Sequence, residues 1–311
     1  MPRVRNWQAI SNPVPALIIW LISALTFYIL FQMALRNSTP SSSTGWSLSN
    51  VERRTKLYDE LSRELDVKGA AFLKNGETSQ SLSLSDLFTV KNGAVTPVLR
   101  AANPPVRANV LYMSPQYSLP VAEAVQKVFM PYFDKVIWFQ NSTLYHFSMF
   151  HASHHITPVT ASEVEIEAEA NAVKAVAKDV CPLKISLDRV VLTSTGVLLG
   201  CWQVISGLDP AVLRDRLRSA LPQAPAIQLY DSAIFHTSLA RLLGHPTNFP
   251  KEQKISELQF LHELVNELNR KLRGFQATIS ELWYVEEYDL LALALNGRVK
   301  ARKFQLSCSK T

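Results

Sequence analysis

The hydrophobic pattern separates an uncharged N-terminal stretch from a long region of alternating strand and helix patterns. Residues 16–35 carry no charged side chain, and this run matches the roughly 20 residues that a helix needs to cross a bilayer. Arg3 and Arg5 precede it, whereas only Arg36 follows closely. This asymmetry predicts a membrane anchor with a cytosolic tail at 1–15 and the bulk of the chain in the secretory-pathway lumen (Golgi or ER) or outside the cell. A cleaved signal peptide is the alternative.

The segment after the predicted anchor lacks a regular pattern at first. Residues 36–50 are rich in Ser and Thr, which predicts a flexible stem. Residues 51–65 have leucines at helical spacing with charges between them, which predicts an amphipathic helix. Glycines and prolines interrupt the apolar pieces that follow. We therefore expect residues 51–105 to form an N-terminal extension of low definition.

From residue 106 onward, apolar runs of strand length alternate with amphipathic helices. We expect strands at 108–113, 135–139, 185–193, 197–205, 279–284, 290–295 and 299–306, and helices at 120–133, 162–178, 209–221 and 256–272. The apolar run around His146 is followed by helix, strand and strand, and so is the run around His236. This repetition predicts a duplicated α+β fold over 106–311, with two lobes and a central cleft.

Two short strings in those apolar runs carry the candidate chemistry. Each consists of a histidine, one spacer and a serine: His146 with Ser148, and His236 with Ser238. Side chains at positions i and i+2 of a strand point to the same face, so each string places an imidazole beside a hydroxyl. Two such pairs facing each other would hold a phosphate and move protons on both sides of it.

The two strings resemble the repeated motif of the two-histidine (2H) phosphoesterase superfamily, which includes cyclic nucleotide phosphodiesterases and bacterial and plant RNA ligase-like proteins. That motif reads His-hydrophobic-Ser/Thr-hydrophobic. The string at His146 matches it fully, whereas the string at His236 has Thr237 where an apolar residue is usual. The resemblance covers 106–311 and, together with the predicted anchor, indicates a membrane-anchored, plant-type member.

The resemblance implies an enzyme that hydrolyses a cyclic phosphodiester, such as the 2′,3′-cyclic phosphate of a nucleotide or of an RNA end. His146 and His236 would serve as general acid and base, because the ordinary histidine pKa of about 6.5 lies near working pH. Ser148 and Ser238 would donate hydrogen bonds to the non-bridging phosphate oxygens. No metal and no other cofactor is implied, no protein partner is inferable, and either histidine can be the acid.

Other functions remain open alternatives. A non-catalytic member of the same fold would bind a nucleotide or another phosphorylated ligand. A Golgi type II glycosyltransferase would share the layout of short tail, anchor and Ser-rich stem, although the chain contains no Asp-x-Asp motif for a metal. A purely structural membrane protein is a further alternative, because a lone histidine in an apolar strand is more often part of the core.

A cluster of three histidines, His151, His154 and His155, follows the first motif. As metal ligands these residues lack an accompanying carboxylate or cysteine at a suitable spacing. We therefore expect a solvated loop here.

Composition adds little to these interpretations. The net charge of +6 permits an anionic substrate without indicating nucleic acid. Asn37 and Asn141 begin glycosylation acceptor patterns, which matter only in the secretory pathway. Cys181, Cys201 and Cys308 have no zinc-binding spacing, so we expect either one disulfide with one free thiol or three buried thiols.

Overall fold

The structure is a computed structural model that describes residues 49–74, 82–91, 93–249 and 255–308. All of these residues belong to one compact unit, Leu48–Thr311. The predicted tail at 1–15, the predicted membrane helix at 16–35, the stem up to residue 48 and Asn37 lie outside the described residues. Among the described residues, no helix is both long enough and apolar enough to cross a bilayer.

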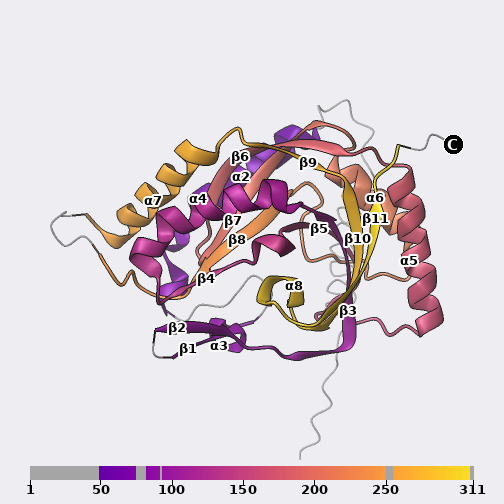
Figure 1. Ribbon diagram of the computed structural model, residues 1–311, viewed down its shortest axis with the longest axis horizontal. Coiled ribbons are helices and arrows are strands. Elements are labelled where there is room, and N and C mark those ends of the chain that lie inside the picture. The colour runs from indigo at the N-terminus through magenta and orange to yellow at the C-terminus, as the bar shows by residue number, and fades with distance from the viewer. Residues whose placement is uncertain (1–48, 75–81, 92, 250–254, 309–311) are drawn as a thin grey trace, which may run out of the picture. The chain divides into compact units, whose positions relative to one another are not determined.

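Two antiparallel sheets form the frame of this mixed α/β unit (Figure 1). The first sheet has the order β11-β10-β3-β5, with β3 (Ala101–Tyr112), β5 (His146–Ser153), β10 (Glu281–Asp289) and β11 (Val299–Gln305). The second has the order β4-β8-β7-β6-β9, with β4 (Ile137–Phe139), β6 (Leu183–Leu192), β7 (Val197–Ser206), β8 (His236–Leu242) and β9 (Gln276–Ile279). A separate hairpin joins β1 (Phe88–Lys91) to β2 (Ala94–Pro97).

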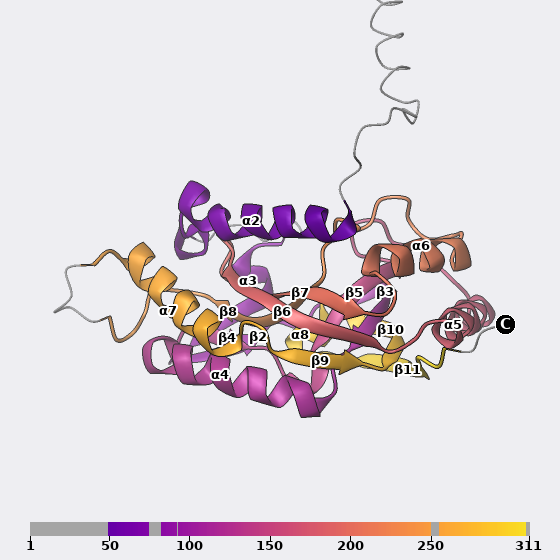
Figure 2. The same ribbon diagram turned by 90° about the horizontal axis from the view of Figure 1, so that it is seen from above.

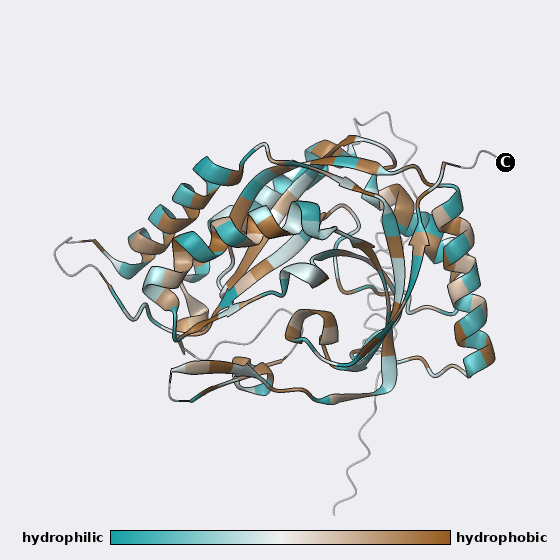
Figure 3. Ribbon diagram, in the orientation of Figure 1, coloured by the Kyte–Doolittle hydropathy of each residue, from teal (hydrophilic) through white to brown (hydrophobic). Residues whose placement is uncertain are grey.

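Helices cover the outer faces of both sheets. The long ones are α2 (Asn50–Lys68), α4 (Pro115–Phe133), α5 (Glu163–Lys178), α6 (Pro210–Ala220) and α7 (Glu257–Leu272), and the short ones are η1 (Ala71–Lys74), α3 (Leu84–Leu87), η2 (Ser142–Leu144) and α8 (Ala292–Leu295). α5 and α6 pack beside the first sheet, whereas α4 and α7 pack beside the second. α2 lies across the second sheet on the side opposite α4 (Figure 2). Hydrophilic and hydrophobic residues alternate along α5 and α7 (Figure 3), as expected for helices with one buried face.

The helix starts follow the capping signals of the sequence. Ser162 accepts the backbone N–H of Glu165, and the Glu165 carboxylate accepts that of Ser162, which completes a capping box at α5. Asp209 caps α6, and Ser256 caps α7. The predicted helices at 162–178, 209–221 and 256–272 are therefore confirmed within a few residues.

The predicted repeat is present, but its two copies exchange strands. β5 is followed by α5, β6 and β7, and β8 is followed by α7, β9 and β10. β6 and β7 of the first copy join the second sheet, whereas β10 of the second copy joins the first sheet. Each sheet therefore carries one His-x-Ser string, although neither sheet is a continuous half of the chain.

Two regions differ from the expected elements. The strand expected at 290–295 is wrong, because β10 ends at Asp289 and the chain then forms α8, flanked by Leu291 and Asn296 with positive φ angles of 56° and 58°. The segment 51–105, expected as an extension, contains α2, α3 and the hairpin, and it lies in the same compact unit as 106–311. The predicted stem overlaps this unit at its end, since Ser49 caps α2.

Candidate functional site

The structure brings the four predicted phosphate-site residues to one cavity of about 310 Å³. His146 and Ser148 line it from β5, and His236 and Ser238 line it from β8. The intervening residues Phe147 and Thr237 are buried on the opposite faces of their strands, which is the alternation that a strand requires.

The two strands are joined beneath the cavity by aromatic packing. The Phe147 ring stacks on the Phe235 ring with a centroid distance of 4.2 Å, and it meets Trp202 edge-on at 5.8 Å. Thr237 belongs to this cluster, because its hydroxyl oxygen accepts the Trp202 indole N–H at 3.1 Å. The polar residue at position 237 therefore pairs a buried donor and faces away from the cavity.

The His146 imidazole has a defined orientation. Its Nδ1 lies 2.8 Å from the Leu144 carbonyl oxygen. Since a carbonyl only accepts, this hydrogen bond places a proton on Nδ1 and leaves Nε2 as an acceptor in the neutral ring. Burial lowers the pKa of His146, and the hydrogen bond to Leu144 partly offsets that effect. The neutral ring is the form that a general base requires.

The His236 imidazole has a different environment. Its Nδ1 is buried and has no hydrogen-bond partner among the described residues. Burial, together with the positive charges of Arg214 and His146, lowers the pKa of His236 to about 3. His146 therefore lies close enough to His236 to lower its pKa. The Tyr230 ring packs against His236 at a centroid distance of 5.2 Å.

Arg241 is a site residue that the sequence interpretation missed. It lines the cavity from β8, and its Nη1 is buried without a hydrogen-bond partner among the described residues. Burial lowers the pKa of Arg241 to about 10, so the side chain keeps its charge at neutral pH. A guanidinium with a free N–H inside a cavity is suited to an anionic oxygen.

The position of Arg241 results from an irregularity in β8. Simple alternation would place residue 241 on the face opposite His236 and Ser238. The pairing of β7 with β8 shifts register between Leu198 and Leu199, so that Val197 pairs with Arg241 and Leu199 with Ser238. One extra residue in β8 therefore returns the side chain at 241 to the cavity. The only sequence signal was a charged residue inside an apolar run.

The same irregularity in β5 brings His151 to the cavity. The pairing of β3 with β5 shifts register after Val110, which pairs with Ser148, so that Ala108 pairs with His151. His151 is buried and lines the cavity, and burial together with the charges of nearby histidines and Arg214 lowers its pKa to about 3.

The expectation of a solvated loop at the histidine cluster is therefore wrong. β5 continues to Ser153, and His154 is also buried, with its ring nitrogens bound to the backbone of Ile227 and Thr157. Among the described residues, no group of three or more histidine, cysteine or acidic side chains is arranged to hold a metal ion.

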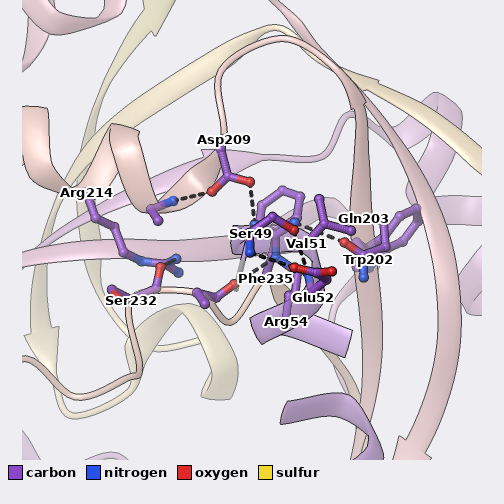
Figure 4. A network of polar contacts seen from close by, with 12 residues as sticks. Ser49, Val51, Glu52, Arg54, Trp202, Gln203, Asp209, Arg214, Ser232 and Phe235 are labelled. Atoms are coloured by element: carbon purple, nitrogen blue, oxygen red, sulfur yellow. Dashed lines mark hydrogen bonds and ion pairs between the residues drawn. The ribbon is translucent and has the colours of Figure 1, made fainter. Parts of the chain in front are cut away.

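Arg214 ties the two motif strands together from behind the cavity. It donates to the carbonyl oxygens of Ser148 and Met149 in β5 at 2.9 and 3.0 Å. Its third bond goes to the carbonyl oxygen of Ser232, ahead of β8, at 2.7 Å (Figure 4). These contacts fix the backbone on both sides of the site, and the buried positive charge adds to the attraction of an anion.

The first sheet supplies an apolar wall with one acid. Val106, Ala108 and Val110 of β3 line the cavity together with Glu287 of β10. Glu287 is buried and accepts the backbone N–H of Leu293 at 3.0 Å. Burial raises the pKa of Glu287 to about 7, and the Leu293 hydrogen bond acts in the opposite direction.

The remaining candidate residues lie away from the cavity lining. Asn141 begins η2, where its side chain accepts the backbone N–H and the hydroxyl of Thr143. Cys181 and Cys308 form a disulfide, and Cys201 is a buried free thiol. The first of the two expectations for the cysteines is thus the one that the structure adopts.

No protein-family model and no curated protein sequence matches this chain. Among solved structures, it is similar to TT0787 of Thermus thermophilus (13% identity, 66% of this chain and 100% of that chain, TM-score 0.45). It is also similar to E. coli LigT complexed with 3′-AMP (13%, 65% and 98%, TM-score 0.40) and to Kluyveromyces marxianus Usb1 with uridine monophosphate (14%, 65% and 97%, TM-score 0.32). Similarity at these scores decides no function, which must be inferred from the site itself.

Proposed function

We propose that this chain is a phosphoesterase that binds a cyclic phosphodiester in the cavity and opens it with water to a monoester. The proposed substrate is the 2′,3′-cyclic phosphate of a nucleotide or of an RNA end. The observation that carries the proposal is the meeting of both His-x-Ser pairs and an unpaired guanidinium nitrogen in one cavity. Its volume of about 310 Å³ lies at the small end of the range for ligand sites, roughly 300–1,000 Å³.

The proposed reaction assigns one proton transfer to each histidine. His146 accepts a proton from the attacking water through Nε2, because Nδ1 is held by Leu144. The water oxygen bonds to phosphorus as one ester bond of the ring breaks. His236 gives a proton to the departing ribose oxygen, after a bound phosphate has raised its pKa. Each such transfer is typically worth about 10²- to 10⁴-fold in rate.

Two hydroxyl groups and one guanidinium group donate hydrogen bonds to the phosphate oxygens. In this proposal Ser148 and Ser238 donate hydroxyl hydrogens to the non-bridging oxygens, and Arg241 offers its free Nη1 hydrogens. These donors lie on two strands of the sheets, and donors aimed at the oxygens where charge develops stabilise the transition state.

Hydrolysis of 2′,3′-cyclic AMP by the purified full-length chain tests the proposal. We expect His146→Ala and His236→Ala each to lower kcat by about 10²-fold or more. His262→Gln is the matched control, because His262 lies near the surface beside Asp66 and does not line the cavity. Equal rates for the wild type and both motif variants would refute the proposed function.

One observation favours a second candidate, a non-catalytic phosphate-binding protein. The lowered pKa of His236, about 3, leaves this ring neutral at pH 7 before a phosphate binds, so it holds no proton to donate. Calorimetry with 2′,3′-cyclic AMP separates the two functions. Binding that Arg241→Gln abolishes, without turnover by the wild type, would identify the binding protein.

We also propose that residues 16–35 anchor the chain in a membrane with the cavity-bearing unit in the secretory-pathway lumen. The Cys181–Cys308 disulfide supports this placement, since disulfides persist mainly in oxidising compartments. Protease treatment of intact microsomes provides the test. A lumenal unit is protected until detergent is added, whereas digestion without detergent would contradict the proposal.

A further inference from the structure

Helix α2 buries two polar side chains completely. Arg54 and Tyr58, in the first three turns of α2, are both 0% exposed. Burying an arginine and a tyrosine is costly unless their polar atoms are paired. Their partners therefore indicate what α2 contributes.

The Tyr58 hydroxyl is bonded to the residue directly before His236. It lies 2.7 Å from the Phe235 carbonyl oxygen and 2.8 Å from that of Trp202, and it accepts the Phe235 N–H at 3.2 Å. Burial raises the pKa of Tyr58 well above 10, so the hydroxyl keeps its proton. One side chain of α2 thus engages both backbone polar groups of Phe235.

Arg54 holds the same segment two residues earlier. Its Nε donates to the Ala233 carbonyl oxygen at 2.8 Å. Its Nη1 and Nη2 donate to Gln203 and Asp209 at 3.0 and 2.7 Å, so the guanidinium joins this segment to β7 and to the start of α6 (Figure 4). On the surface, Arg53 pairs with Asp231 at 2.8 Å.

The segment from 229 to 235 contains no helix and no strand. Besides the bonds from α2, Arg214 binds the Ser232 carbonyl oxygen and the Trp202 N–H donates to that of Phe235. The ladder of β8 begins at His236 itself, which pairs with Cys201. Tyr230 and Ile234 of the segment line the cavity, and so do Leu61 and Glu64 of α2. The bond that satisfies the Phe235 N–H, directly before His236, comes from α2.

We infer that α2 supports the catalytic site and that Tyr58 is a positioning residue for His236, because it holds the backbone of Phe235. The inference rests on the proposed function of the cavity, but it concerns a helix outside the region 106–311 that carries both motifs. Loss of the Tyr58 hydroxyl leaves the buried Phe235 N–H without its acceptor. The segment then relaxes and the His236 ring moves. A displacement of about 1 Å at a reacting group is enough to cost about 10²-fold in rate.

Tyr58→Phe in the full-length chain tests this inference, because it removes the hydroxyl and keeps the ring. We expect kcat for 2′,3′-cyclic AMP to fall by about 10-fold or more while KM changes little, since Tyr58 does not line the cavity. Asp59→Asn is the matched control. It removes the negative charge that pairs with Arg189 of β6 at 2.6 Å and keeps the bonds of Arg54 and Tyr58 to the segment 229–235.

A second measurement needs no turnover. The chain has seven histidines, so the ring signals of His236 can be assigned by NMR as those missing from His236→Asn. We expect Tyr58→Phe to shift these signals without substrate and Asp59→Asn to leave them unchanged. If the wild type shows no activity but the NMR signals shift as expected, the proposed function fails and the positioning role of Tyr58 is still supported. Unshifted His236 signals in Tyr58→Phe, or equal losses of kcat in both variants, would overturn the inference.

Discussion

Strands β5 and β8 each direct three side chains into the cavity. The first two are the same in both strands, and the third differs. Each presents a histidine and then a serine, and each has an irregularity that returns the fifth residue after the histidine to the cavity. That residue is His151 in β5 and Arg241 in β8. The proton-transfer groups are thus duplicated, whereas the permanent positive charge lies on β8 alone.

The surroundings of the two strands extend this difference. β5 belongs to the sheet that contributes Glu287, whose pKa burial raises to about 7. β8 contributes Arg241, which remains charged across the physiological range. An anion is therefore attracted to the β8 side, and the β5 side changes its charge with pH. The fixed charge therefore comes from the repeated strand pattern itself, whereas the titratable acid comes from β10, the neighbour of β3 in the first sheet.

The largest expected effect comes from removing the fixed charge. Arg241→Gln should lower kcat/KM for 2′,3′-cyclic AMP by about 10²-fold, because a preorganised donor to a developing charge is lost. His151→Gln should change it by less than about threefold, because the ring is neutral and is not assigned to a proton transfer. Steady-state kinetics at pH 7 checks both, with the exposed Arg216→Gln as control. Equal losses at 151 and 241 would remove the proposed asymmetry.

Stability in acid should depend on His151 and not on Arg241, because only the histidine changes its charge between pH 7 and pH 3. The pKa of His151 in the folded chain is about 3, against about 6.5 in an unfolded chain. Below pH 6.5 the unfolded chain binds a proton that the folded chain refuses, so the free energy of unfolding falls as pH drops towards 3. His151→Gln should remove about 1.4 kcal/mol per pH unit from this slope. Melting curves from pH 7.5 to 4.5 check it, and an unchanged slope would contradict the buried neutral ring.

Glu287→Gln should have a smaller effect with the reverse pH dependence. The pKa of Glu287 is raised from 4.5 to about 7, so its contribution to stability is present below pH 4.5 and is lost as pH rises to about 7. Glutamine can still accept the Leu293 N–H without becoming charged. The melting temperature of the variant should exceed that of the wild type at pH 8 and match it at pH 4. A lower melting temperature at pH 8 would show that the ionised carboxylate is stabilising.

The smallest expected effect on activity concerns Thr237, which stands between His236 and Ser238. Thr237→Val leaves the buried Trp202 indole N–H without its acceptor, which should cost about 1 kcal/mol or more of unfolding free energy. The rate of hydrolysis should stay close to that of the wild type, since Thr237 points away from the cavity. Urea unfolding and kinetics measure the two quantities. A large loss of kcat without a loss of stability would assign Thr237 a direct role in the reaction.

The sequence predicts the parts of this site that depend on local rules. The period of two in a strand places His146 beside Ser148, and capping residues such as Ser162 begin helices where their pattern indicates. His151 and Arg241 were missed because a register shift depends on the partner strand. Residues 290–295 were misassigned because an apolar run does not reveal the left-handed backbone at Leu291. The partners of Tyr58 lie 144 and 177 positions away, beyond the reach of any local pattern.

The stacked rings of Phe147 and Phe235 bear on how such a cavity changes over evolution. Each phenylalanine adjoins a motif histidine in the chain, and the rings are in van der Waals contact at 4.2 Å. The separation of the two imidazoles is therefore inherited from the packing of the hydrophobic core. A lineage could adapt to a bulkier or a smaller phosphate ester by exchanging core residues while both His-x-Ser strings stay intact. The two His-x-Ser strings alone would then not reveal which phosphate ester such a protein accepts.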